Sequence, residues 1–143
     1  MGSGAVARRR FAVVDIDAHF GDGTALQFWN DKSVLTISIH WSQHESGSMY
    51  PFLQGGSGER GGEGAEGTNL NLPLPDGSDD ATLSRAINSA ILSLRAFRPS
   101  GIFVACGFDG LDSDPSSKLR FTPAGYGAAV EALVEAFPNI SVL

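Results

Sequence analysis

Hydrophobic residues in this chain fall into short runs that alternate with longer periodic segments. Four runs are continuously apolar or rich in β-branched residues, as is typical of buried strands: residues 11–14, 33–39, 101–106 and 140–143. Two longer segments repeat apolar residues at helical spacing, and a short helix is expected over residues 24–29. Strands that alternate with helices need crossover connections, so the pattern predicts an α/β fold with a parallel sheet.

The two longer predicted helices have recognisable ends. We expect Ser78 to cap the start of the first helix and Pro99 to follow its end. Thr122 is a favourable N-cap residue and Pro123 suits a first helical position, so the second helix should begin there and stop before Pro138.

A long irregular segment separates the second predicted strand from the first long helix. Its core, residues 54–67, is rich in glycine and is predicted to be a loop, of the kind that is functional or disordered in compact domains. Residues 69–72 alternate polar and apolar side chains and predict a short edge strand. We expect a flexible N-terminal tail over residues 1–10 and one α/β domain over residues 11–143.

Composition narrows the function classes. A formal net charge of −6 argues against direct nucleic-acid binding, which needs a basic face. No segment approaches the roughly 20 apolar residues of a membrane span. The single cysteine, Cys106, excludes an internal disulfide and favours an intracellular protein, in the cytoplasm or the nucleus. Its apolar neighbours indicate a small buried residue rather than a catalytic thiol.

Polar side chains follow three of the predicted strands, where ligand sites form in open α/β sheets. They are Asp15, Asp17, His19, Ser38, His40 and Asp109. If the first strand continues far enough, alternate residues Asp15, Asp17 and His19 share one face. We expect His40 to be a hydrogen-bonded structural residue.

Carboxylates placed close together in a poorly solvated site need a positive partner. Aspartate oxygen with histidine nitrogen suits zinc, and Asp109 is the natural third ligand after Asp17 and His19. Aspartates at strand ends also cap turns, so the motif alone leaves both readings open.

Two other functions are compatible with this pattern. In a magnesium-dependent phosphatase of the haloacid-dehalogenase kind, Asp15 would be the nucleophile and Asp17 the acid. That family wants Thr or Val where His19 stands, and no convincing lysine motif follows, since the only lysines are Lys32 and Lys118. The chain could also be a non-catalytic remnant that binds a metal or a partner.

Several ordered motifs resemble the histone deacetylase family, in its bacterial or class II-like branch. VVDIDAHFGDGT resembles the first metal-binding segment of that family, and GFDGLDSDP followed by FTPAGY resembles the second. The resemblance spans about Phe11 to Leu143. It implies part of the three-layer arginase/deacetylase α/β domain, in which helices flank a parallel sheet.

The resemblance also implies roles for individual residues. Asp17, His19 and Asp109 would bind zinc, and Asp15, Ser38 and Ile39 would help to surround a monovalent cation such as K⁺. Asp15 and Asp22 match carboxylates that orient the two histidines of a catalytic dyad. Substrate-binding positions match Tyr50, in the wall of the acyl-lysine tunnel, and Gly107.

The implied reaction is zinc-dependent hydrolysis of an acetylated lysine or a small acetylated amine. The family's histidine dyad lies upstream of the first motif and its catalytic tyrosine lies downstream of the last, and neither is matched here. We therefore expect a central fragment of the domain that is inactive, or nearly so, by itself. Partner subunits are compatible with such a piece, whereas nucleic acid and membrane are not expected partners.

Overall fold

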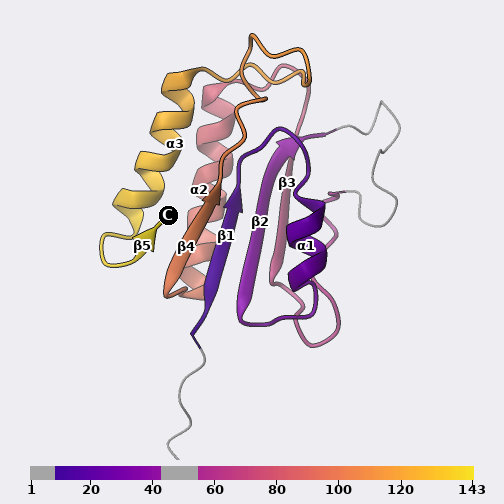
Figure 1. Ribbon diagram of the computed structural model, residues 1–143, viewed down its shortest axis with the longest axis vertical. Helices are drawn as coiled ribbons and strands as arrows, with labels where there is room; N and C mark the ends of the chain where they lie inside the picture. Colours follow the sequence, from indigo (N-terminus) through magenta and orange to yellow (C-terminus); the bar gives the residue numbers. More distant parts are fainter. Residues whose placement is uncertain (1–8, 43–54) are drawn as a thin grey trace, which may run out of the picture.

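The computed structural model describes residues 9–42 and 55–143 (Figure 1). Its strands are β1 (Phe11–Asp15), β2 (Val34–Trp41), β3 (Asn69–Leu74), β4 (Gly101–Ala105) and β5 (Ser141–Val142). They form one sheet in the order β3-β2-β1-β4-β5, and every neighbouring pair is parallel. The predicted parallel α/β sheet is confirmed.

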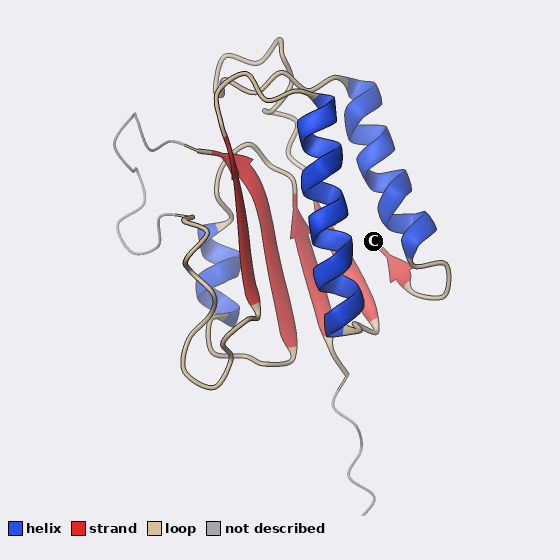
Figure 2. Ribbon diagram, turned by 180° about the vertical axis from the view of Figure 1, so that it is seen from behind, coloured by secondary structure: helices blue, strands red, loops and turns tan. Residues whose placement is uncertain are grey.

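Helices lie on both faces of this sheet, as predicted. Helix α1 (Asp22–Phe28) lies on one face beside β2, whereas α2 (Asp80–Phe97) and α3 (Pro123–Ala136) lie together on the other (Figures 1 and 2). None of the helices in the described ranges is long and apolar enough to cross a bilayer.

The core lies between the sheet and the pair α2 and α3. Strand β1 is central and pairs Val14 with Ile37 of β2 and with Val104 of β4. The face of α2 that meets the sheet follows the predicted helical period, with buried Leu83, Ile87, Ile91 and Leu94. Each Å² of apolar surface that this packing removes from water stabilises the folded state by about 25 cal/mol.

The sequence predicted the N-cap residue of α3 correctly but not that of α2. Thr122 caps α3 as expected, because its hydroxyl accepts the N–H of Gly125 at 3.1 Å. The cap of α2 is Asp79 and not Ser78. The Ser78 hydroxyl instead donates to the carbonyl of Pro75 at 2.7 Å, while Asp79 accepts the N–H of Thr82 at 3.0 Å.

The described part of the glycine-rich loop is held by hydrogen bonds. The N–H of Gly62 donates to the carbonyl of Trp29, and a Cβ on Gly62 would collide with Trp29 and Asn30. The side chain of Asn69 donates to the carbonyl of Glu59 at 2.8 Å. Ala65 is 2% exposed, so this segment also buries a small apolar contact.

Candidate metal centre

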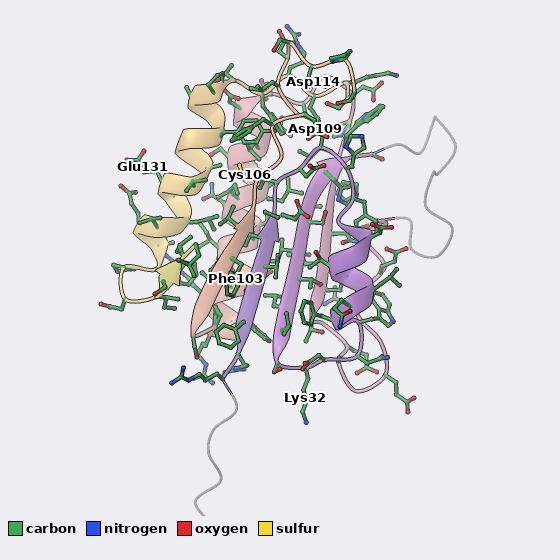
Figure 3. The ribbon with its side chains drawn as sticks, in the orientation of Figure 1. Lys32, Phe103, Cys106, Asp109, Asp114 and Glu131 are labelled. Atoms are coloured by element: carbon green, nitrogen blue, oxygen red, sulfur yellow. The ribbon has the colours of Figure 1, made fainter. Side chains whose placement is uncertain are left out.

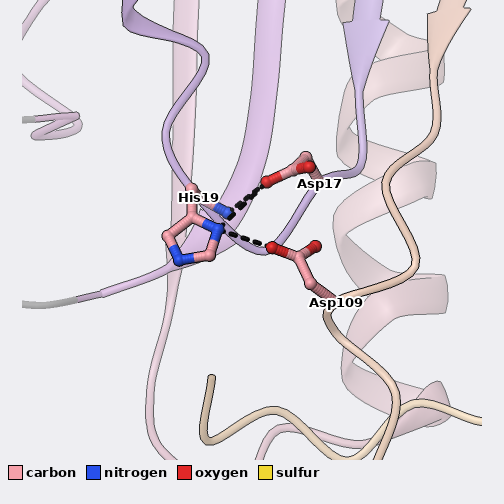
Figure 4. Close-up of side chains that lie close together, drawn as sticks. All are labelled: Asp17, His19 and Asp109. Carbon is pink, nitrogen blue, oxygen red and sulfur yellow. Dashed lines mark hydrogen bonds and ion pairs between the residues drawn. The ribbon is translucent and has the colours of Figure 1, made fainter. Parts of the chain in front are cut away.

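Asp17, His19 and Asp109 meet beyond the carboxyl ends of β1 and β4 (Figure 4). The Nδ1 atom of His19 lies 2.5 Å from Oδ2 of Asp109 and 3.3 Å from Oδ1 of Asp17. One ligand atom from each residue lies within 4.8 Å of the other two. The three residues proposed from the sequence are therefore neighbours in space.

The backbone reaches this arrangement by turning, not by extending the strand. Strand β1 ends at Asp15, so it does not continue far enough for Asp15, Asp17 and His19 to share one strand face. Oδ1 of Asp15 accepts the N–H of Asp17 at 3.0 Å, and Oδ1 of Asp17 accepts the N–H of His19 at 2.7 Å. Two successive side-chain-to-backbone bonds thus define the turn, as aspartates at strand ends commonly do.

Asp109 is oriented by the same turn, from the other side. Its Oδ1 accepts the N–H of Ala18 at 2.9 Å, which directs Oδ2 toward His19. Gly107 lies against Asp17, and a Cβ at this position would collide with the Asp17 carboxylate. The absence of a side chain at Gly107 therefore lets the two strand ends approach.

The donor set fits a divalent metal ion. Two carboxylates and one imidazole are three protein ligands of the kind found in catalytic zinc sites, which keep a fourth position open. The side chains of Asp17, His19 and Asp109 are 38%, 28% and 23% exposed, so the cluster is reachable from solvent.

Asp15 lies beneath this cluster and is buried. Burial raises the pKa of its carboxyl to about 6. The hydrogen bond from the N–H of Asp17 opposes this rise, and the charges of Asp17 and Asp109 reinforce it.

The pKa of the Cys106 thiol is also raised, first by burial and then by the charges of Asp15 and Asp17. Cys106 is partly exposed rather than buried as predicted, and the raised pKa disfavours a reactive thiolate.

The residues predicted for a monovalent cation lie on neighbouring strands. Ser38 of β2 pairs in register with Asp15 of β1, and Ile39 follows it, 1% exposed. The Ser38 hydroxyl accepts the N–H of Gly21 at 3.3 Å.

The sequence predicts site roles for two further residues, Asp22 and Tyr50, besides the cluster of Asp17, His19 and Asp109. Asp22 is the first residue of α1, and its Oδ1 accepts the N–H of Gly23 at 2.7 Å. Tyr50 lies outside the described residues, so its predicted place in the substrate channel stays a prediction.

His40 is the hydrogen-bonded structural residue that the sequence predicts. It is 3% exposed, and its Nδ1 lies 2.9 Å from the hydroxyl of Ser38. Its Nε2 lies 3.1 Å from the carbonyl of Gly55, and its ring packs against Phe20 with centroids 5.1 Å apart. His40 thus links β2 to the start of the described glycine-rich loop.

The sequence reasoning missed two residues that contact the Asp109 loop. Tyr126 lies among the buried residues of α3, and its hydroxyl accepts the N–H of Gly110 at 3.2 Å. Ser117 donates from its hydroxyl to the carbonyl of Asp109 at 2.8 Å. The signal available was a tyrosine among apolar helix positions shortly after the GFDG motif.

The fold and this site together define a class of protein. It is an α/β protein that can hold a metal ion at the carboxyl edge of a parallel sheet, between a central strand and its neighbour. Figure 3 shows Asp109 in the loop beyond β4. The comparisons with known proteins narrow the class to one family.

A family model described as the histone deacetylase domain matches residues 4–143. The chain belongs to the histone deacetylase family. It is 36% identical over 130 residues to histone deacetylase 18 of Arabidopsis thaliana, covering 89% of this chain and 19% of that protein. It is 36% identical over 118 residues to an acetylpolyamine amidohydrolase of Burkholderia pseudomallei, covering 82% of this chain and 34% of the relative.

Solved structures agree with this assignment. The crystal structure of acetylpolyamine aminohydrolase from Burkholderia pseudomallei superposes with a TM-score of 0.81 at 34% identity, covering 93% of this chain and 38% of that one. A histone deacetylase homologue solved with SAHA gives a TM-score of 0.83 at 29% identity, covering 94% and 36%. The chain thus spans between 19% and 38% of the length of these relatives.

Proposed function

We propose that this chain carries the metal-binding part of a zinc-dependent deacetylase active site. The observation that carries the proposal is the meeting of Asp17, His19 and Asp109 beyond β1 and β4. The names of the relatives, histone deacetylase and acetylpolyamine amidohydrolase, support an acetylated lysine or a small acetylated amine as substrate.

The chain's own residues would hold and orient the metal. When bound, zinc would polarise the acetyl carbonyl and lower the pKa of a water molecule toward about 7. Asp109 is held in place for this purpose by the N–H of Ala18. Gly107 leaves the approach to Asp17 free of a side chain.

The remaining catalytic groups of the family reaction are not matched in this chain. Its three histidines are His19, His40 and His44, which do not form an adjacent pair. His19 is assigned to the metal and His40 to a structural network, so Asp15 and Asp22 have no dyad to orient here. Without a general base we propose hydrolysis about 10²–10⁴-fold slower than in a complete enzyme.

We propose a monovalent cation, K⁺ in particular, beside the zinc position. Asp15 and Ser38 lie opposite one another on β1 and β2, and both are buried with oxygen-bearing side chains. Ile39 would contribute its backbone oxygen. A cation there would compensate the buried charge of Asp15.

The sequence left two alternative functions open, a non-catalytic binding remnant and a haloacid-dehalogenase-like phosphatase. A remnant that binds metal or a partner subunit, without catalysis, shares the same metal centre and differs only in its turnover. Membership of the histone deacetylase family leaves the haloacid-dehalogenase hypothesis without support.

A metal and activity assay tests the proposal. The purified 143-residue chain is loaded with zinc, and its metal content and hydrolysis of an acetyl-lysine peptide and an acetylated diamine are measured. We expect retained zinc and turnover at least about 100-fold below a full-length relative. Failure to retain zinc overturns the metal centre, and turnover near that of the relative overturns the proposed slow hydrolysis.

A further inference from the structure

One peptide group beside the metal centre is held from both sides. The carbonyl of Asp109 and the N–H of Gly110 belong to the same planar peptide unit. The Ser117 hydroxyl donates to that carbonyl at 2.8 Å, and the Tyr126 hydroxyl accepts from that N–H at 3.2 Å. Two hydroxyls from separate parts of the chain therefore engage opposite ends of one peptide.

Both hydroxyls are themselves fixed in place. Tyr126 is 4% exposed, and its ring packs edge-on against Phe108 and Phe121, with centroids 5.4 and 5.7 Å away. The Ser117 hydroxyl also accepts the N–H of Leu119 at 3.3 Å. Each hydroxyl thus has a defined position before it meets the Asp109–Gly110 peptide.

This peptide needs such restraint because of the glycine that follows Asp109. Glycine tolerates many backbone conformations, so rotation of the peptide is opposed by few steric contacts. A Cβ on Gly110 would lie 2.6 Å from the Tyr126 hydroxyl oxygen, which leaves no room for a more restrictive residue. The same peptide anchors the Cα of Asp109, so a backbone shift at this point would carry the carboxylate away from Ala18 and His19.

We propose that Ser117 and Tyr126 are positioning residues that hold the Asp109–Gly110 peptide, and thereby the Asp109 carboxylate, in the metal-binding orientation. The inference rests on the proposed function in taking Asp109 as a metal ligand. Groups that orient a metal ligand typically contribute about 10–100-fold to metal affinity. Because metal affinity scales with the fraction of correctly oriented ligand, losing both hydroxyls weakens binding more than the product of the single losses.

The test compares Tyr126→Phe, Ser117→Ala and the double variant with Thr36→Val. The control removes another buried hydroxyl, which donates to Asn69 at 2.8 Å and lies in β2, a strand that β1 separates from β4. Zinc affinity is measured by chelator competition on the full chain. We expect about three- to fivefold weaker binding for each single variant and about 30- to 100-fold for the double, which exceeds the product of the single losses. Thr36→Val should stay within about twofold of the parent, because Thr36 does not touch the Asp109 loop.

A second readout needs no metal. Ala18 donates its N–H to Asp109, so hydrogen exchange of this amide reports the carboxylate orientation in the zinc-free chain. We expect faster exchange in the single variants and fastest in the double, with no change in Thr36→Val. Unchanged Ala18 exchange in Ser117→Ala, which alters a partly exposed loop, overturns the inference even if Tyr126→Phe fails to fold.

The two readouts separate the two proposals. If the parent chain does not bind zinc, the metal centre is overturned. If the Ala18 amide nevertheless exchanges faster in the double variant than in the parent, the positioning role is supported. Zinc binding that is equal in the parent and the double variant overturns the positioning role and leaves the metal centre supported.

Discussion

The Nδ1 atom of His19 lies 2.5 Å from Oδ2 of Asp109, although α1, β2, β3, α2 and β4 separate them in the sequence. The contact follows from strand register, because Asp15 and Ala105 pair at the ends of β1 and β4. The segments after these residues leave the sheet side by side. The imidazole therefore lies between carboxylates from two strand ends, and these are ligand types that a zinc ion takes in proteins.

Loss of one carboxylate from the cluster should abolish tight zinc binding. We expect Asp109→Asn to weaken zinc affinity by at least about 100-fold, beyond the effect of an outer-shell partner. Asp112→Asn is the matched control, since the Asp112 side chain forms an exposed ion pair with Arg120 at 3.0 Å and does not belong to the cluster. Equal zinc affinities of the two variants in chelator competition would contradict the assignment of Asp109.

Gly107 and Gly127 should respond oppositely to alanine. At Gly107 a Cβ would collide with Asp17, so Gly107→Ala should lower both the Tm and zinc affinity. Gly127 lies within α3 with nothing near its Cβ position, so Gly127→Ala should stabilise the fold by about 0.5–1 kcal/mol. Thermal unfolding and zinc titration of both variants check this, and a neutral Gly107→Ala would count against the close approach of the strand ends.

We expect substitution of His40 to lower stability and substitution of His19 to remove zinc binding. His40→Ala removes buried hydrogen bonds to Ser38 and Gly55, so we expect a loss of about 2–4 kcal/mol in the free energy of unfolding. His19 is more exposed, and His19→Ala should change the metal-free stability by less than about 1 kcal/mol while removing zinc binding. Urea unfolding of the metal-free variants measures the first effect, and similar losses in both would refute the structural role of His40.

The cap of α2 should make stability depend on pH in the acid range. The hydrogen bonds from the N–H and hydroxyl of Thr82 hold the pKa of Asp79 below its ordinary value. The stabilisation is therefore present above the ordinary pKa and is lost as pH falls through the lowered one. We expect Asp79→Ala to lower the Tm at pH 7 and to differ less from the parent in strong acid.

Ser89→Ala is the control for the cap, because Ser89 lies on the exposed side of the same helix and its hydroxyl donates only to the carbonyl of Arg85. It should leave the Tm nearly unchanged at both pH values. An Asp79→Ala variant with an unchanged Tm at pH 7 would contradict the capping role of Asp79.

Local patterns were enough to predict most elements of this fold. Continuous apolar runs predicted β1, β2 and β4, since a strand buried on both faces needs no polar alternation. The start of α3 followed from Thr122 and Pro123, whose preferences act within one turn. The cap of α2 was predicted one residue early, because Ser78 and Asp79 are both good caps and only the carbonyl of Pro75 distinguishes them.

The sequence by itself determined the residue types of the candidate metal cluster, the parallel α/β fold and, through its ordered motifs, the family. Only the tertiary structure decided that β1 stops at Asp15, so that a turn and not a strand face presents Asp17 and His19. It also decided which groups hold Asp109, since Ala18, Ser117 and Tyr126 are remote from one another or unremarkable in sequence. Propensity and periodicity act over a few residues, whereas these contacts arise from strand register and the packing of α3.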